Sequence, residues 1–247
     1  MRARSIPFEM DVRPLVAQID AELRDRGTAE RAEQEKAYLR SDLGHYGTTV
    51  PAVRAIAKSV GARYPALGHD DLVALVDALW SVPVHERRMA AVELLDLHKE
   101  RLQCDDMRLL EHLLREARTW ALVDGLAASV AGPLFERHPE LGAVLDRWAV
   151  DEDFWLRRSA LLALLLALRR GAGDFARFSR YADMMLEEKE FFIRKAIGWV
   201  LRDTARTRPA MVYEWLLLRA ARLSGVALRE AVKPLSEQQR AAVLAAR

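Results

Sequence analysis

Residues 118–124 read Arg-Thr-Trp-Ala-Leu-Val-Asp, and this stretch near the middle of the chain governs how the rest is interpreted. On a helix, Trp120 and Asp124 lie four residues apart, so the indole and the carboxylate share one face. Lys195 and Trp199 repeat that spacing with a cation and an aromatic ring. A helix that needed only a core would carry Leu and Ala at such positions, because Trp is bulky and an unpaired Asp is costly to bury. The pattern therefore predicts helices that also present a contact surface.

The same motif belongs to a loose repeat. Arg88, Asp124, Arg158 and Lys195 each lie early in a long apolar helical segment, and they are separated by 36, 34 and 37 residues. This spacing is typical of HEAT-like repeats, whose inner helices line a concave wall. We therefore expect these polar side chains to project into one groove. The alternative is chance, since any chain built of helix pairs would show some coincidences of spacing.

Composition agrees with an all-α fold. The chain has 247 residues, of which 51% are hydrophobic and 30% charged, with only 12 Gly and 9 Pro. Helix-period patterning is extensive and alternating β-branched runs are absent. The expected architecture is a HEAT-like helical repeat solenoid with a concave DNA-binding groove. No linker interrupts the pattern, so we expect a single domain over residues 1–247, with residues 1–8 as a loose N-terminal lead-in.

Local signals predict where several helices begin and end. Gly27 closes one helix and Thr28 caps the next, Pro51 suits a first helical turn, and Ser236 with Gln239 forms a capping box for the last short helix. The expected N-terminal helices cover residues 9–26, 29–43, 51–63, 70–80 and 83–100.

Several function classes receive no support from the sequence. Cys104 is the only cysteine, so no internal disulfide is possible, and the six histidines show no ligand spacing that would indicate a zinc site. The N-terminus lacks an apolar core for a secretory signal, and the longest apolar run is far too short for a membrane span. We therefore expect a cytoplasmic, nucleoid-associated protein that needs no cofactor. A net charge of +2 means that any DNA-binding surface is local.

The chemistry suggested by the motifs is cleavage of an N-glycosidic bond. If Trp120, Asp124, Arg158 and Trp199 converge, they supply one carboxylate, one guanidinium and two indoles. An anion stabilises the oxocarbenium-like sugar formed during such cleavage, and Arg can hold a phosphate. A nucleophile beside a His and a Gly-rich phosphate loop are both missing from the sequence.

At these residues the chain resembles the AlkD-type DNA alkylation repair glycosylases, which are built of HEAT-like repeats. The similarity covers roughly residues 10 to 235, and the segment from Phe191 to Arg202 is its most specific part. The segments that carry the resemblance are 36–39, 79–83, 120–124, 134–141, 154–158 and 190–202.

The resemblance implies a monomer that excises N3- and N7-alkylated purines, 3-methyladenine and 7-methylguanine, from double-stranded DNA. Excision would proceed without flipping the base into a deep pocket, because an alkylated purine that already carries positive charge leaves easily. The residues that match the family's site are Asp124 as the catalytic carboxylate, Trp120 and Trp199 as aromatics on the sugar and backbone, Arg158 as the phosphate ligand, and Tyr38 as a further aromatic at the groove. Lys195 is expected to bind DNA with them, and Arg157 is an alternative phosphate ligand. Thr119 stands where members often carry a second Trp.

Other interpretations remain open from the sequence. Asp124 could be a surface or capping carboxylate, Trp120 and Trp199 could be core residues, and Arg157 and Arg158 could form ion pairs between repeats. The chain as a whole could be a non-catalytic scaffold that binds DNA structures or a protein partner, or a peptide-binding solenoid.

Overall fold

A computed structural model describes residues 10–247, and within them the protein is an all-α helical repeat protein. No strand occurs in this part of the chain, where the one β-type contact is an isolated bridge between Gly44 and Val84. The predicted fold class is thus confirmed. The lead-in expected at residues 1–8 lies outside the described residues.

Contacts between residues gather into two compact units, one ending at Leu102 and one covering Gln103–Arg247. We refer to them as unit 1 and unit 2, and describe each by itself. Whether they act as the single domain expected from the sequence stays a prediction.

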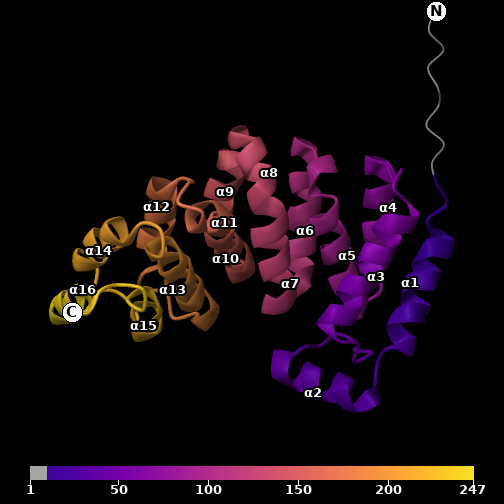
Figure 1. The fold of residues 1–247 in the computed structure, drawn as a ribbon, viewed down its shortest axis with the longest axis horizontal. Helices are drawn as coiled ribbons and strands as arrows, with labels where there is room; N and C mark the ends of the chain where they lie inside the picture. Colours follow the sequence, from indigo (N-terminus) through magenta and orange to yellow (C-terminus); the bar gives the residue numbers. More distant parts are fainter. Residues whose placement is uncertain (1–9) are drawn as a thin grey trace, which may run out of the picture. The chain divides into compact units, whose positions relative to one another are not determined.

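The described part of unit 1 contains five α-helices, of which α5 packs on both α3 and α4 (Figure 1). Thr28 accepts a hydrogen bond from the Arg31 amide, so it caps its helix as predicted, and Pro51 lies in the first turn of the next. The second helix ends at Leu39, four residues before the predicted end, because Arg40 adopts a left-handed conformation with φ of 49°. The helices are α1 (Arg13–Asp25), α2 (Ala29–Leu39), α3 (Val50–Arg63), α4 (His69–Trp80) and α5 (His85–Leu97).

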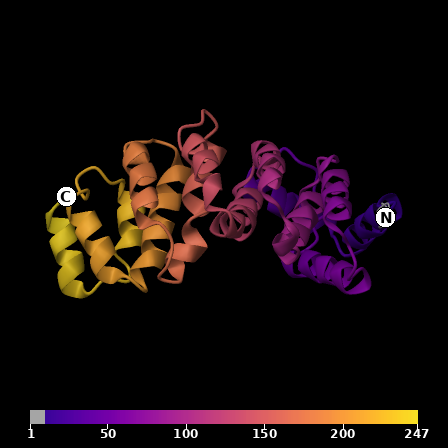
Figure 2. The ribbon, with the colours of Figure 1, turned by 90° about the horizontal axis from the view of Figure 1, so that it is seen from above.

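Unit 2 is a succession of packed helices (Figure 2), in which α13 contacts both α10 and α15. The predicted capping box is present at the last helix, where Ser236 and Gln239 cap each other's backbone amides. The helices are α6 (Met107–Ala117), α7 (Trp120–Asp124), α8 (Gly132–Arg137), α9 (Gly142–Trp148), α10 (Phe154–Leu162), α11 (Leu165–Arg169), α12 (Phe175–Met185), α13 (Phe191–Ala205), α14 (Pro209–Leu217), α15 (Gly225–Ala231) and α16 (Glu237–Ala245).

Side-chain hydrogen bonds recur through unit 2 at a nearly fixed separation of 34 to 36 residues. This separation matches the spacing from which the repeat was predicted. Each bond joins residues about one repeat length apart in the sequence, and we call the set the inter-repeat ladder. Its members are Glu111–Arg147, Arg115–Asp151, Asp124–Arg158, Glu136–Arg170, Asp146–Tyr181, Arg169–Asp203, Ser179–Trp215, Asp183–Arg219 and Glu187–Arg222.

Candidate functional site

The backbone before Asp124 is sharply bent. Helix α6 ends at Ala117, and Arg118 then adopts a left-handed conformation with φ of 53°, which is uncommon for a residue other than Gly. Thr119 is extended and precedes α7 as its N-cap residue. The five residues of α7 run from Trp120 to Asp124, so the predicted pair occupies one face of a single helical turn. Strained backbone of this kind is often found at functional sites.

Directly after Asp124 the helix widens. Residues Gly125–Ala131 form a π-helical segment that leads into α8. Such segments are rare and are frequently associated with functional sites. Gly132, at the start of α8, lets the chain after α10 approach closely, because a Cβ there would lie 2.5 Å from the carbonyl oxygen of Ala163. The glycine and the widened turn together bring α10 against the helical stretch that carries Asp124.

Arg158 of α10 meets Asp124 in a bidentate ion pair. Its Nε donates to Asp124 Oδ1 at 2.8 Å and its Nη2 donates to Oδ2 at 2.9 Å. Its remaining nitrogen, Nη1, donates to the carbonyl oxygen of Phe192 at the start of α13. The Arg158 side chain is only 4% exposed, whereas Asp124 is 17% exposed. The arginine therefore lies beneath the carboxylate and links α7, α10 and α13 in one network.

The electrostatic environment of Asp124 contains two opposed effects. Burial raises the pKa of the Asp124 carboxyl above its ordinary value, and the hydrogen bonds and charge of Arg158 lower it in part. The guanidinium is thus the group that favours the ionised carboxylate in this buried setting. A bidentate arginine uses one lone pair on each carboxylate oxygen, so the carboxylate retains acceptor capacity for another positive group.

Aromatic rings gather next to this network, at the N-terminal ends of α10 and α13. The ring of Phe192 packs against Trp155 with centroids 5.0 Å apart and stacks with Phe154 at 6.4 Å. Arg158 lies over the Phe192 ring at 5.8 Å, and Phe191, which is 50% exposed, packs edge-on against Phe192. We call Phe154, Trp155, Phe191 and Phe192 the aromatic cluster.

The predicted residues on α13 lie on the same helix as this cluster. Trp199 follows Phe192 by seven residues, which is two helical turns, so both share a face of α13. Trp199 is half-buried and its indole N–H donates to Asp203 Oδ2 at 3.1 Å. Lys195 is exposed, and its ammonium lies 5.9 Å from the centre of the Phe191 ring. The structure thus brings Asp124 and Arg158 into direct contact, and places Trp199 and Lys195 on the neighbouring helix.

Arg157 and Tyr38 are located differently. The Arg157 guanidinium makes a bidentate pair with Glu188, at 2.7 and 2.9 Å, and also donates to the carbonyl oxygens of Asp151 and Glu152. This is the ion pairing between repeats that the sequence left open as an alternative. Tyr38 is 73% exposed on α2 and belongs to unit 1.

Sequence reasoning did not find the role of Phe192. Its hydrogen bond with Arg158 is accepted by the backbone carbonyl oxygen of Phe192. A backbone carbonyl leaves no trace in the pattern of side chains along the sequence. The adjacent pair Phe191-Phe192 at the start of a helix was the available signal. Arg158 was expected to hold a phosphate, and the structure adds its contact with Asp124, which the spacing of 34 residues between them indicates.

Comparisons with known proteins agree with this picture. The family model described as DNA alkylation repair enzyme matches residues 19–235. Among solved structures, one described as a predicted DNA alkylation repair enzyme from Enterococcus faecalis is similar with a TM-score of 0.76 and 23% identity. The match covers 86% of this chain and 98% of that chain, and at this identity it shows the fold. No curated protein matches the chain.

Within the described residues, no helix is both long enough and apolar enough to cross a lipid bilayer.

Proposed function

Because the chain belongs to the DNA alkylation repair enzyme family, we propose that it is a DNA glycosylase that excises N3- and N7-alkylated purines, such as 3-methyladenine and 7-methylguanine, from double-stranded DNA. Its reaction is hydrolysis of the N-glycosyl bond in base-excision repair. The observation that carries the proposal is the carboxylate of Asp124, which is half-buried, bound by Arg158 and located one turn after Trp120.

Asp124 supplies the group that this chemistry requires. Loss of the base leaves positive charge on the sugar, and a preorganised carboxylate stabilises that charge more effectively in a water-poor site than in bulk water. The same carboxylate can orient the attacking water. A purine alkylated at N3 or N7 is already cationic and leaves without protonation, so one carboxylate is sufficient and no general acid is needed. For the same reason the base need not enter a deep pocket, in contrast to most enzymes that act on a base.

Arg158 has a positioning role in this proposal. Its two bonds to Asp124 fix the carboxylate in one orientation, and its bond to the Phe192 carbonyl anchors it to α13. A guanidinium has five N–H donors, so contact with a DNA phosphate remains compatible with these three bonds. Trp120 and Trp199 would pack on the sugar and backbone, and Lys195 and Tyr38 would contact the duplex. We further propose that the protein acts as a monomer with a concave HEAT-like surface on nucleoid DNA in the cytoplasm.

The test is release of 7-methylguanine and 3-methyladenine from methylated duplex DNA by the wild type and by Asp124→Asn. We expect the variant to lose about 10²- to 10³-fold in the single-turnover rate, the scale on which one electrostatic stabiliser acts. The matched control is Asp183→Asn, because Asp183 also makes a bidentate pair on the ladder, with Arg219. This control should keep the wild-type rate. Circular dichroism and thermal melting would confirm that both variants are folded.

Two outcomes would contradict the proposal. Normal release by folded Asp124→Asn would remove the catalytic role of the carboxylate. If the wild type releases neither base but binds duplex DNA in a salt-dependent way, the chain is a non-catalytic DNA-binding scaffold instead.

A further inference from the structure

A second group of side chains lies in unit 1, and none of its members belongs to the proposed glycosylase site. Glu35 comes from α2, His45 from the loop between α2 and α3, and Glu86 from the first turn of α5. One ligand atom from each residue lies within 4.8 Å of the others. The three residues are separated by 10 and 41 positions in the chain, so the sequence showed no ligand spacing.

Several of these atoms are buried without a hydrogen bond. Both ring nitrogens of His45 and Oε2 of Glu35 have no hydrogen-bond partner among the described residues, although they are shielded from solvent. The ion-pair contact of Glu35 Oε2 is with Arg31 Nη2 at 3.7 Å, which is too long for a hydrogen bond. Leaving such groups unsatisfied costs free energy, so buried polar atoms of this kind call for a bound water or ion.

Glu86 is held rigidly in place beside them. Its side chain is buried, and its Oε1 accepts hydrogen bonds from the amides of Gly47 and Thr48, while Oε2 accepts one from Tyr46. Oε2 therefore keeps one lone pair for another ligand. Support of this kind around a carboxylate fixes its orientation, as it does in known metal sites.

His45 is also oriented by its neighbour. Its ring stacks on that of His85 with centroids 4.8 Å apart and planes 11° apart. Because the lone pairs of an imidazole lie in the ring plane, two parallel rings cannot direct nitrogens to the same ion, and His85 serves as a support.

We propose that Glu35, His45 and Glu86 bind one divalent transition-metal ion, with Zn²⁺ as the best fit to an imidazole and two carboxylates. Tetrahedral zinc with bonds of about 2.1 Å needs ligand atoms roughly 3.4 Å apart, and side-chain rotation in Glu35 and His45 supplies the contraction. Water takes the fourth position. The ion fastens α2 and the following loop to α5.

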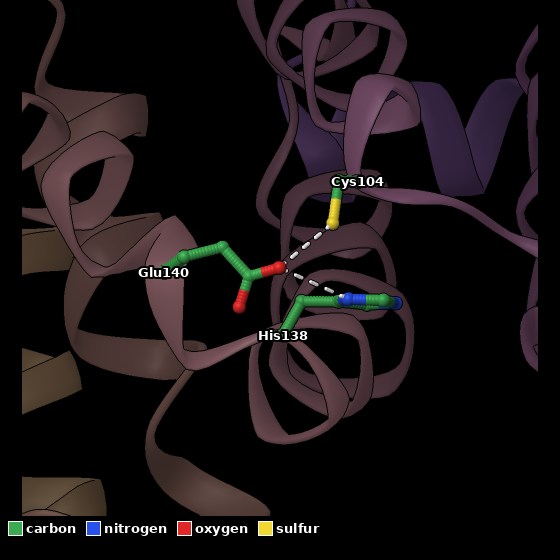
Figure 3. Close-up of side chains that lie close together, drawn as sticks. All are labelled: Cys104, His138 and Glu140. Carbon is green, nitrogen blue, oxygen red and sulfur yellow. Dashed lines mark hydrogen bonds and ion pairs between the residues drawn. The ribbon is translucent and has the colours of Figure 1, made fainter.

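The chain contains another group with ligand atoms at similar distances, in unit 2. Cys104, His138 and Glu140 lie together as shown in Figure 3, where Oε1 of Glu140 is 3.2 Å from the Cys104 sulfur and 3.3 Å from Nδ1 of His138. This group differs in two respects. Its polar atoms already bond one another, and Glu140 is exposed. It therefore provides the matched control.

The experiment is titration of the metal-stripped full-length protein with ZnCl₂ alone, in competition with a chromophoric chelator. We compare the wild type, Glu35→Gln, His45→Phe, and the double variant Cys104→Ser/His138→Gln. His45→Phe keeps an aromatic ring to stack on His85. The wild type and the double variant should bind one equivalent with the same affinity. Each change in Glu35 or His45 should weaken binding at least about 100-fold, because it removes a direct ligand.

Substitution with Co²⁺ gives a second readout that does not depend on variants. Near-ultraviolet absorption of Co²⁺ bound to wild-type protein should lack the thiolate-to-cobalt charge-transfer band, since the proposed ligands contain no sulfur. The proposal is overturned by a thiolate band, by loss of binding in the double variant alone, or by the absence of one-equivalent zinc binding to the wild type.

Discussion

Asp124 and Arg158 form an ion pair in which the arginine affects the ionisation of the carboxylate, and the carboxylate takes up two of the arginine's nitrogen donors. The arginine is almost fully buried and directs its donors at the carboxylate and at the Phe192 carbonyl. The carboxylate reaches the surface from a buried setting that favours its protonated form. In the proposed reaction, the arginine would act through the protonation state and orientation of Asp124.

Arg158→Gln should therefore change the pH dependence of base excision. Burial already raises the pKa of Asp124 and Arg158 lowers it, so loss of the guanidinium raises that pKa further. In the proposed mechanism the ionised carboxylate is the active form, and it would then be reached only at higher pH. We expect a lower rate near neutral pH and an acid limb displaced upward, measured by single-turnover excision across pH. In Arg158→Lys, which keeps a positive charge, the acid limb should be displaced less than in Arg158→Gln.

The control for this experiment is Arg219→Gln, which removes the same bidentate interaction from Asp183. It should leave the pH profile of excision unchanged. A slower Arg158→Gln enzyme with an unshifted acid limb would indicate that Arg158 acts by another route, such as direct contact with a phosphate.

At the scale of elements, the site depends on the close approach of α10 to the helical stretch from Trp120 to Arg137. Gly132 permits that approach, and the π-helical segment Gly125–Ala131 sets the direction in which Asp124 points relative to α8. The position of the carboxylate is thus controlled by backbone several residues away from it.

Gly132→Ala tests this dependence. The added methyl would meet the Ala163 carbonyl oxygen at 2.5 Å, so the backbone must shift. Overpacking of this type costs about 1–3 kcal/mol in the free energy of unfolding, measured by urea denaturation. Because α10 carries Arg158, the excision rate should fall as well. Gly61→Ala is the control, since a Cβ there would meet the flexible His98 ring at an ordinary contact distance of 3.5 Å. Equal effects of the two substitutions on stability and on the excision rate would show that the close approach at Gly132 is unimportant.

Much of this level of structure was predictable from local chemistry. Thr28, Pro51 and the Ser236–Gln239 box marked helix starts because capping and proline geometry depend on nearby residues alone. The end of α2 and the bend at Arg118 were not predictable, since an arginine occupies the left-handed position in both cases and arginine carries no signal for it.

The candidate site likewise contains one contact that the sequence could predict and one that it could not. The spacing of 34 residues between Asp124 and Arg158 reflects the repeat, so their contact could be predicted. The pairing of Arg157 with Glu188 could not be separated from phosphate binding, because adjacent arginines look equivalent in a sequence and only the direction of each side chain distinguishes them.

At the scale of the whole molecule, the Asp124–Arg158 pair and the aromatic cluster lie entirely within unit 2. The inter-repeat ladder also runs through this unit, so its helices are joined by side-chain contacts as well as by their apolar core. Unit 2 therefore has what a segment needs to fold by itself.

A fragment of residues 103–247 should be folded. We expect a strongly helical circular dichroism spectrum and a cooperative thermal transition, because the contacts that form the core and the inter-repeat ladder of unit 2 lie within that unit. Its affinity for duplex DNA should be lower than that of the full chain, since it lacks Tyr38. A broad, non-cooperative melt would show that unit 2 depends on unit 1 for its fold.

The ladder also restricts how the length of this protein can change during evolution. Each of its contacts joins residues about one repeat apart, so duplication or loss of a whole repeat near the C-terminal end would leave the surviving pairs in register. A residue inserted inside a ladder helix would instead rotate the side chains that follow it by about 100° and turn them away from their partners. The Asp124–Arg158 pair is itself one of these contacts. A repeat gained between those two residues would preserve the architecture and separate the carboxylate from its arginine, so relatives of altered length are expected to differ in repeat number outside this interval.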